Sequence, residues 1–300
     1  WIRLKLAESP AFARMKAEGR GSTTPLKDSF GKWPNLKLVL LALFGLAAGQ
    51  AVVWYTGQFY ALFFLEKTLK VDPALANVLI AISLALATPF FVFWGWLSDK
   101  VGRKPIILIG CLLAALTYFP LFHALTGAAN PRLAAATASA PVTVVADPAD
   151  CAFQFDPVGK TVFDSSCDMA KSYLAKAGVT YETVAAPAGT VAEVRIGDTV
   201  VPGLADPSGK AEWEKGLGAA LTAAGYPAKA DSALVNKPLV VGILFVLVLY
   251  VTMVYGPIAA ALVEMFPTRV RYTSMSLPYH IGNGWFGGFL PTTAFAMVAA

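Results

Sequence analysis

The sequence has 300 residues, of which 56% are hydrophobic and 14% are charged, and its formal net charge is +5 at pH 7. Soluble domains carry roughly one quarter charged residues, so this composition excludes an ordinary soluble domain and indicates a membrane protein. The positive charge is concentrated in particular segments, so it bears on orientation in the membrane and does not indicate a nucleic-acid partner. The chain starts at Trp1 without Met and stops within an apolar run, which predicts an internal piece of a longer protein.

Residues 1–37 carry eight Lys or Arg against three Asp or Glu. Basic segments next to membrane spans stay on the cytoplasmic side. Ser9 and Pro10 are typical of the first residues of a helix, and Gly19 is typical of its end. We therefore predict a cytoplasmic segment with a short amphipathic helix on the inner face of the membrane.

Five apolar stretches follow, and each is long enough for a membrane-spanning helix, which needs about 20 residues. All Lys, Arg, Asp and Glu residues lie in connections or at the edges of these stretches. We predict three transmembrane helices in residues 38–129 and two in residues 238–300. The individual spans are expected within 38–65, within 73–98, after Lys104, within 238–263 and from Tyr272 to the end.

Residues 130–237 between the third and fourth spans predict a small α+β insert on the outer side of the membrane. Its beginning, 134–145, is rich in Ala, Thr, Ser and Pro and is typical of a linker. Helix and strand patterns follow. Helices are expected over 166–178 and 208–225, and strands over 181–184 and 191–201.

The insert contains two cysteines, Cys151 and Cys167. On the oxidising side of a membrane such a pair favours a disulfide, and the alternative is two free thiols. Their spacing matches no common zinc pattern, so we expect no metal site. Cys111, in the third span, is expected to be a small apolar side chain.

The sequence Gly95-Trp96-Leu97-Ser98-Asp99-Lys100-Val101-Gly102-Arg103-Lys104 joins the second and third spans. Gly102 permits a tight turn, and Arg103 and Lys104 favour the cytoplasmic side. Asp99 is a candidate latch, because a carboxylate can hold a helix N-terminus or an arginine. With Gly95 included, this pattern resembles the cytoplasmic signature loop of the major facilitator superfamily of transporters.

Residues 52–65, 264–273 and 281–291 resemble the metabolite:proton symporter branch of that superfamily, which includes proline/betaine, shikimate and α-ketoglutarate carriers. The resemblance implies an all-α membrane protein, half of a twelve-helix bundle, with the spans numbered as helices 7 to 11 and helix 12 absent. It implies a small metabolite and protons as substrates, a bacterial inner membrane, no cofactor and no enzymatic activity. The missing N-terminal half would complete a monomeric carrier and supply the carboxylate for proton coupling.

Polar side chains within the spans are candidates for the wall of a substrate cavity, because amides are costly in lipid unless they are paired or hydrated. Gln50, Trp54 and Gln58 recur at i, i+4 and i+8, and the alternative for the amides is a bridging role between helices. His280 could respond to a proton gradient or stay neutral. Gly284 and Gly288 at i, i+4 predict a close approach of another helix. The proposed cavity residues are Gln50, Trp54, Tyr55, Gln58, Ser276, His280 and Asn283.

The loop between the last two spans contains Glu264, Arg269 and Arg271. The resemblance implies that Glu264 pairs with Arg103 and that Asp99 lies near Arg271 or Arg269, which would lock the cytoplasmic side in one state. The alternative is that these residues only set the topology.

A different function remains open from the sequence alone, namely a membrane-anchored solute sensor or binding protein that acts through the insert. Five spans with polar residues are more than an anchor requires, so we favour the carrier. The substrate is not specified, because the branch handles organic acids as well as zwitterionic osmolytes.

Overall fold

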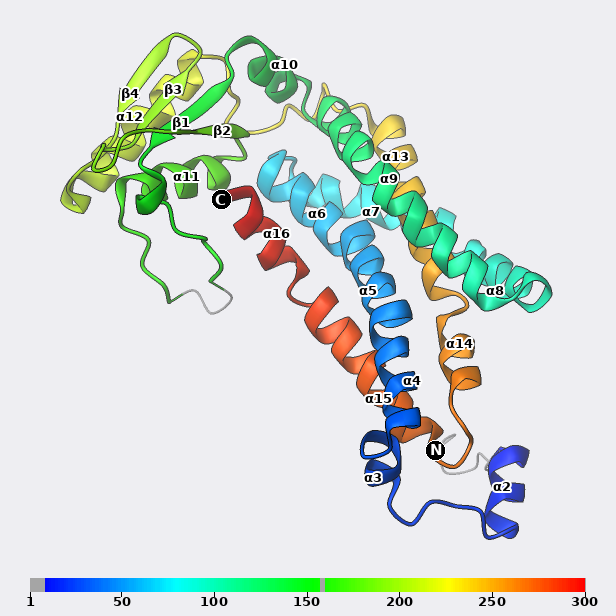
Figure 1. Ribbon diagram of the computed structural model, residues 1–300. Coiled ribbons are helices and arrows are strands. Elements are labelled where there is room, and N and C mark those ends of the chain that lie inside the picture. The colour runs from blue at the N-terminus through cyan, green and yellow to red at the C-terminus, as the bar shows by residue number, and fades with distance from the viewer. Residues whose placement is uncertain (1–8, 157–159, 300) are drawn as a thin grey trace. The chain divides into compact units, whose positions relative to one another are not determined.

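The computed structural model describes residues 9–156 and 160–299 (Figure 1). The first eight residues of the predicted cytoplasmic segment lie outside this description. The α-helices are α2 (Pro10–Ala17), α3 (Pro25–Phe30), α4 (Trp33–Ala42), α5 (Ala48–Tyr55), α6 (Ala61–Phe63), α7 (Pro73–Ala87), α8 (Pro89–Val101), α9 (Arg103–Ala129), α10 (Pro131–Ser139), α11 (Ser166–Ala177), α12 (Lys210–Ala223), α13 (Lys237–Tyr255), α14 (Ile258–Met265), α15 (Arg271–Ile281) and α16 (Leu290–Ala299).

Other helix types and a sheet complete the fold. The π-helical segments are η1 (Leu43–Ala47), η2 (Thr56–Tyr60), η3 (Phe64–Thr68) and η6 (Gly282–Gly287), and the 3₁₀ turns are η4 (Pro148–Asp150) and η5 (Pro207–Gly209). The strands are β1 (Val142–Ala146), β2 (Tyr181–Ala185), β3 (Glu193–Ile196) and β4 (Thr199–Pro202).

Four helices in the described part of the chain are long and apolar enough to cross a membrane: Trp33–Thr68, Pro73–Val101, Arg103–Ala129 and Lys237–Met265. They contain the first four predicted spans. The fifth predicted span, from Tyr272 to the end, is interrupted by a turn within the described residues. Its 11-residue α15 continues into the six-residue η6, and a turn separates η6 from α16. Gly288 and Pro291 lie at this interruption, and both residue types weaken a helix there.

The chain divides into two compact units. The first comprises Trp1–Tyr55, Thr88–Ala115 and Leu249–Gly288, within the residues described above. Its core contains Val39, Ile107, Leu262 and Phe266, all nearly inaccessible to solvent. In this unit α4 and α5 lie beside α15 and η6 (Figure 1).

Glycines allow these helices to approach closely, but they are not the predicted ones. A Cβ at Gly282 would lie 2.8 Å from Cβ of Ala47, and one at Gly287 would lie 2.3 Å from the ring of Tyr55. A Cβ at Gly284 would meet nothing within 4 Å, so the predicted role of Gly284 in the close approach is wrong. The reason is the π-helix: its i→i+5 hydrogen bonds place residues five apart on one face, as Gly282 and Gly287 are.

The second unit comprises Thr56–Ala87, Leu116–Val248 and Phe289–Ala300, within the described residues. It contains a sheet of order β2-β1-β3-β4 in which β1 pairs parallel to β2 and antiparallel to β3, and β3 pairs antiparallel to β4. Helices α11 and α12 contact this sheet (Figure 1). The helices and strands predicted within residues 166–225 are present. Ser165 caps the start of α11, and Gly178 ends it in the left-handed conformation.

The linker predicted for 134–145 is wrong, because this segment forms most of α10 and the start of β1. The side chain of Asn130 accepts a hydrogen bond from the Leu133 amide, and Pro131 occupies the first helical position. In β1, Val142, Val144 and Ala146 alternate with half-buried residues and are themselves buried. Small residues therefore supply a capped helix and a central strand here.

The insert shares one hydrophobic core with the ends of the adjacent spans. Leu65, Leu69 and Leu125 belong to the same buried cluster as Leu174 of α11 and Val144 of β1. The side-chain amide nitrogen of Asn130 donates to the Leu69 carbonyl at 3.0 Å. Nζ of Lys70 donates to the Lys176 carbonyl at 2.5 Å. The insert therefore packs together with the span ends in one unit.

Asp147, after β1, gives the second unit a pH-dependent stability. Its carboxylate accepts hydrogen bonds from the Gly189 and Ala149 amides at 2.8 and 3.0 Å, which lowers its pKa. A depressed folded-state pKa adds stability above the unfolded value of about 3.9, and this stability is lost as the pH falls through the folded pKa. We expect acidification from neutral pH to about pH 3 to lower the melting temperature, and Asp147→Asn to flatten this dependence.

Thermal unfolding of the whole chain in detergent at a series of pH values measures this effect. Asp198→Asn is the matched control, because it removes an equal charge from an exposed hairpin residue. An unchanged pH profile in Asp147→Asn would contradict the assignment.

Candidate functional site

A single glycine separates the two helices that carry the predicted signature. Helix α8 ends at Val101 and α9 begins at Arg103, so Asp99 lies in the last turn of one helix and Arg103 in the first turn of the next. Gly102 has φ +93°, a conformation that favours glycine, and its amide donates to the Ser98 carbonyl at 3.0 Å. The connection is therefore shorter than the loop expected from the sequence.

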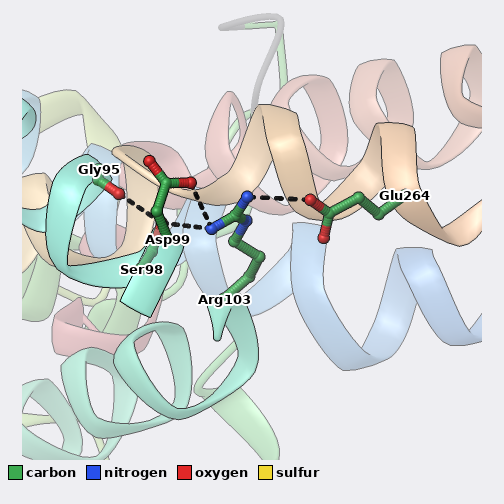
Figure 2. A network of polar contacts seen from close by, with 5 residues as sticks. All are labelled: Gly95, Ser98, Asp99, Arg103 and Glu264. Atoms are coloured by element: carbon green, nitrogen blue, oxygen red, sulfur yellow. Dashed lines mark hydrogen bonds and ion pairs between the residues drawn. The ribbon is translucent and has the colours of Figure 1, made fainter. Parts of the chain in front are cut away.

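Arg103 lies at the centre of a polar network in the first unit (Figure 2). Nη1 is 2.7 Å from Oδ1 of Asp99 and donates to Oγ of Ser98 at 3.3 Å, while Nη2 donates to Oε1 of Glu264 at 3.0 Å. Oγ of Ser98 donates to the Gly95 carbonyl at 2.7 Å. The network thus joins the ends of α8 and α9 to α14.

The guanidinium of Arg103 is much less exposed than its two acidic partners. Its side chain is 20% exposed, against 69% for Asp99 and 57% for Glu264. Nε of Arg103 is buried and has no hydrogen-bond partner among the described residues. The central cation is therefore partly desolvated and keeps one unused donor, whereas both carboxylates remain open to water.

The pairing of Arg103 with Glu264 is present as the resemblance implied, but the expected partner of Asp99 is not. Asp99 pairs with Arg103, whereas Nε of Arg271 donates to the Phe266 carbonyl at 3.1 Å. Because Gly102 makes the turn so short, Arg103 reaches Asp99 on the preceding helix. Lys104 lines a cavity of about 620 Å³ beside Glu264 and Leu108.

The first unit also contains a polar group in its apolar interior. Gln50 on α5 is fully buried, and neither its amide nitrogen nor its oxygen has a hydrogen-bond partner in the described part of the chain. One turn further, the Trp54 ring lies 4.1 Å from the Tyr255 ring, centroid to centroid. The hydroxyls of Tyr255 and Tyr279 are 3.3 Å apart. An unsatisfied buried amide costs about 1–3 kcal/mol.

The remaining predicted cavity residues lie on α5, η2, α15 and η6. Gln58 lies in η2, a π-helical turn, whereas Gln50 and Trp54 lie in the α-helix α5. Tyr55 lies against Gly287, and Asn283 donates to the Tyr279 carbonyl at 2.8 Å. Ser276 and His280 of α15 are exposed, whereas Gln50 is buried.

Tyr255 and Tyr279 are polar residues that the sequence analysis did not select. Tyr255 ends α13, just before the break at Gly256 where a Cβ would lie 3.2 Å from the Phe91 carbonyl. The Gly256-Pro257 pair in an apolar stretch is the signal that could have drawn attention to this position.

We expect Gln50→Leu to separate function from stability. Leu has a similar volume and removes the unsatisfied amide, so the melting temperature should stay the same or rise. If Gln50 serves solute passage, transport should fall at the same time. The control is Thr252→Val, because Thr252 is equally buried but its hydroxyl is satisfied by the Leu249 carbonyl at 2.7 Å. Full transport by Gln50→Leu would show that the amide has no functional role.

Comparisons with known proteins find similarity to membrane transporters. Residues 4–146 match the model of the Major Facilitator Superfamily. The chain is 29% identical over 131 residues to "Putative proline/betaine transporter" of Staphylococcus aureus (strain MSSA476), which covers 41% of this chain and 27% of the relative. It is 30% identical over 113 residues to the protein of the same name in Staphylococcus haemolyticus (strain JCSC1435), covering 37% of this chain and 23% of the relative.

A third relative belongs to another organism. "Putative transporter YdfJ" of Escherichia coli (strain K12) is 31% identical over 119 residues, which covers 39% of this chain and 27% of the relative. The chain therefore spans about a quarter of the length of the curated relatives it matches. No solved structure matches. Through its residues 4–146 the chain is similar to the Major Facilitator Superfamily, and the relatives that it matches are named as transporters.

Proposed function

We propose that the chain is the C-terminal half, helices 7 to 11, of a proton-coupled symporter for a small metabolite in a bacterial inner membrane. The observation that carries this proposal is the network in which one arginine, Arg103, binds carboxylates on two separate elements of the first unit. A transporter that alternates between two states needs contacts that hold one state and release in the other.

The chemistry of the network suits such a latch. Arg103 and Asp99 are joined by a short connection, so their ion pair persists when α14 moves. The Arg103–Glu264 pair joins residues 161 apart in the chain, so displacement of α14 breaks it. Both carboxylates are largely exposed, and water therefore stabilises Glu264 after it is released. The contact biases the equilibrium between states without preventing exchange.

The polar interior supports a path for the solute. Among the described residues, neither hydrogen-bonding group of the Gln50 amide has a partner. Trp54, one turn further along α5, packs near Tyr255, whose hydroxyl lies 3.3 Å from that of Tyr279. Groups of this kind bind a small polar or zwitterionic solute. The relatives named as proline/betaine transporters favour osmolytes and amino acids among the candidates, alongside small organic acids.

Uptake into liposomes tests this proposal. The protein, in the full length that its gene encodes, would be reconstituted and offered labelled proline, glycine betaine, shikimate and α-ketoglutarate, with and without an inward proton gradient. We expect saturable uptake of at least one solute that rises with the gradient. Uptake that is independent of the gradient would contradict proton coupling, and the absence of uptake for every small metabolite would contradict the carrier.

The alternative of an anchored sensor gives a different result in the same assay. Deleting the insert is not a clean test, because its residues share a core with the span ends. Arg103 lies in the first unit, so neutralising it would leave solute binding by the insert intact in a sensor. Loss of uptake in that variant supports the carrier.

A further inference from the structure

A cavity of about 520 Å³ in the first unit has a strongly basic lining. It lies between α2 with the following loop and the segment that leads into α15. Its charged side chains are Lys16, Arg269 and Arg271, and none of its lining residues is Asp or Glu. The transport mechanism proposed above leaves these three cations without a role.

Acidic residues near this cavity are already occupied. Glu18 pairs with Arg20 at 3.2 Å, and Asp28 pairs with Lys32 at 2.6 Å and accepts a hydrogen bond from Ser22. The contacts with Lys32 and Ser22 lower the pKa of Asp28, and the charge of Arg269 adds a smaller effect in the same direction. The positive charge of the cavity is therefore only partly balanced by nearby carboxylates.

The orientation of Arg271 suits a bound anion. Its Nε donates to the Phe266 carbonyl, which fixes the plane of the guanidinium, and its two terminal nitrogens have no partner within the described residues. A fixed guanidinium with two free terminal nitrogens matches the geometry of a phosphate group. The first amides of α15 add further donors, since its N-cap Val270 offers no side-chain cap.

Apolar side chains on the rim identify the source of the phosphate. Phe12 and Met15 of α2 line the cavity, and Tyr272 beside them is 71% exposed. Exposed aromatic residues next to cations are typical of the headgroup region of a membrane. We propose that this cavity binds the phosphate of an anionic phospholipid headgroup, with Lys16, Arg269 and Arg271 as ligands.

Native mass spectrometry of the detergent-purified whole protein tests the site. The probes are phosphatidylglycerol, phosphatidylcholine and inorganic phosphate. We expect selective binding of phosphatidylglycerol, and Arg269→Gln/Arg271→Gln should weaken it about tenfold. Lys16→Gln should weaken it less, and because Lys16 is exposed on α2 this variant carries little risk of misfolding.

The control is Arg14→Gln/Lys27→Gln, which removes two cations from exposed positions that do not line the cavity. Its phosphatidylglycerol binding should match that of the unmodified protein. Equal losses in the control and in the cavity variants would overturn the proposal, as would unchanged binding in the cavity variants. Binding of inorganic phosphate with the same dependence on the variants would support the phosphate site and assign it to a free ligand. Uptake is not measured, so the result is independent of the proposed transport.

Discussion

Replacing Arg103 with Gln should lower solute uptake by about tenfold, the order expected when a charge-assisted contact that favours one of two states is removed. The guanidinium is the only group that binds both Asp99 and Glu264 in the described network. Without it, two carboxylates and the Ser98 hydroxyl lose their common partner. Uptake in liposomes, normalised to the amount of reconstituted protein, measures the loss.

Two further variants make this prediction specific. Lys104→Gln removes an equal charge from the next residue, which forms no ion pair with Asp99 or Glu264 in the described part of the chain, and should transport nearly normally. The exchange Arg103→Glu/Glu264→Arg restores opposite charges across the contact and should recover part of the uptake lost in either single variant. Normal uptake in Arg103→Gln, or an equal loss in Lys104→Gln, would rule out the latch.

Removal of the Cys151–Cys167 disulfide should produce the largest change in stability. The structure joins these cysteines across a sequence separation of 16. Closing a loop of this length restricts the unfolded chain by about 3 kcal/mol. We expect Cys151→Ala/Cys167→Ala to lower the free energy of unfolding of the second unit by this amount. Limited proteolysis and thermal unfolding of the whole chain, with and without reductant, measure it.

The double variant should still fold, because other contacts join the same two segments. The Ala152 amide donates to Oδ1 of Asp168 at 2.8 Å, and Gln154 Nε2 donates to the Asp168 carbonyl at 2.9 Å. Cys111→Ala is the control, since Cys111 is a free thiol and its loss should leave the response to reductant unchanged. Resistance to proteolysis that is identical with and without reductant in the unmodified protein would show that the disulfide contributes nothing.

Local chemistry explains which elements could be predicted. The ends of α2 and α11 follow from Ser9, Ser165 and Gly178, whose capping roles depend on neighbouring residues alone. The apolar runs likewise specify spanning helices, because length and hydrophobicity decide that question. The prediction for residues 134–145 was wrong because an Ala-rich segment is compatible with a linker and also with a capped helix followed by a strand. That strand, β1, becomes buried only when β2 and β3 pair with it.

The amino-acid sequence by itself determined the membrane class and the positions of the apolar helices, because these depend on composition. It also determined the turn at Gly102, which depends on local backbone preference, and the pairing of Arg103 with Glu264, which follows a family pattern. Only the tertiary structure decided which residues share a surface. It placed Gln58 in a π-helical turn, and it put Gly282 and Gly287, in place of Gly284, at the helix contact. The physical reason is that hydrogen-bond register within a helix responds to packing against neighbouring helices, and a single sequence does not record that packing.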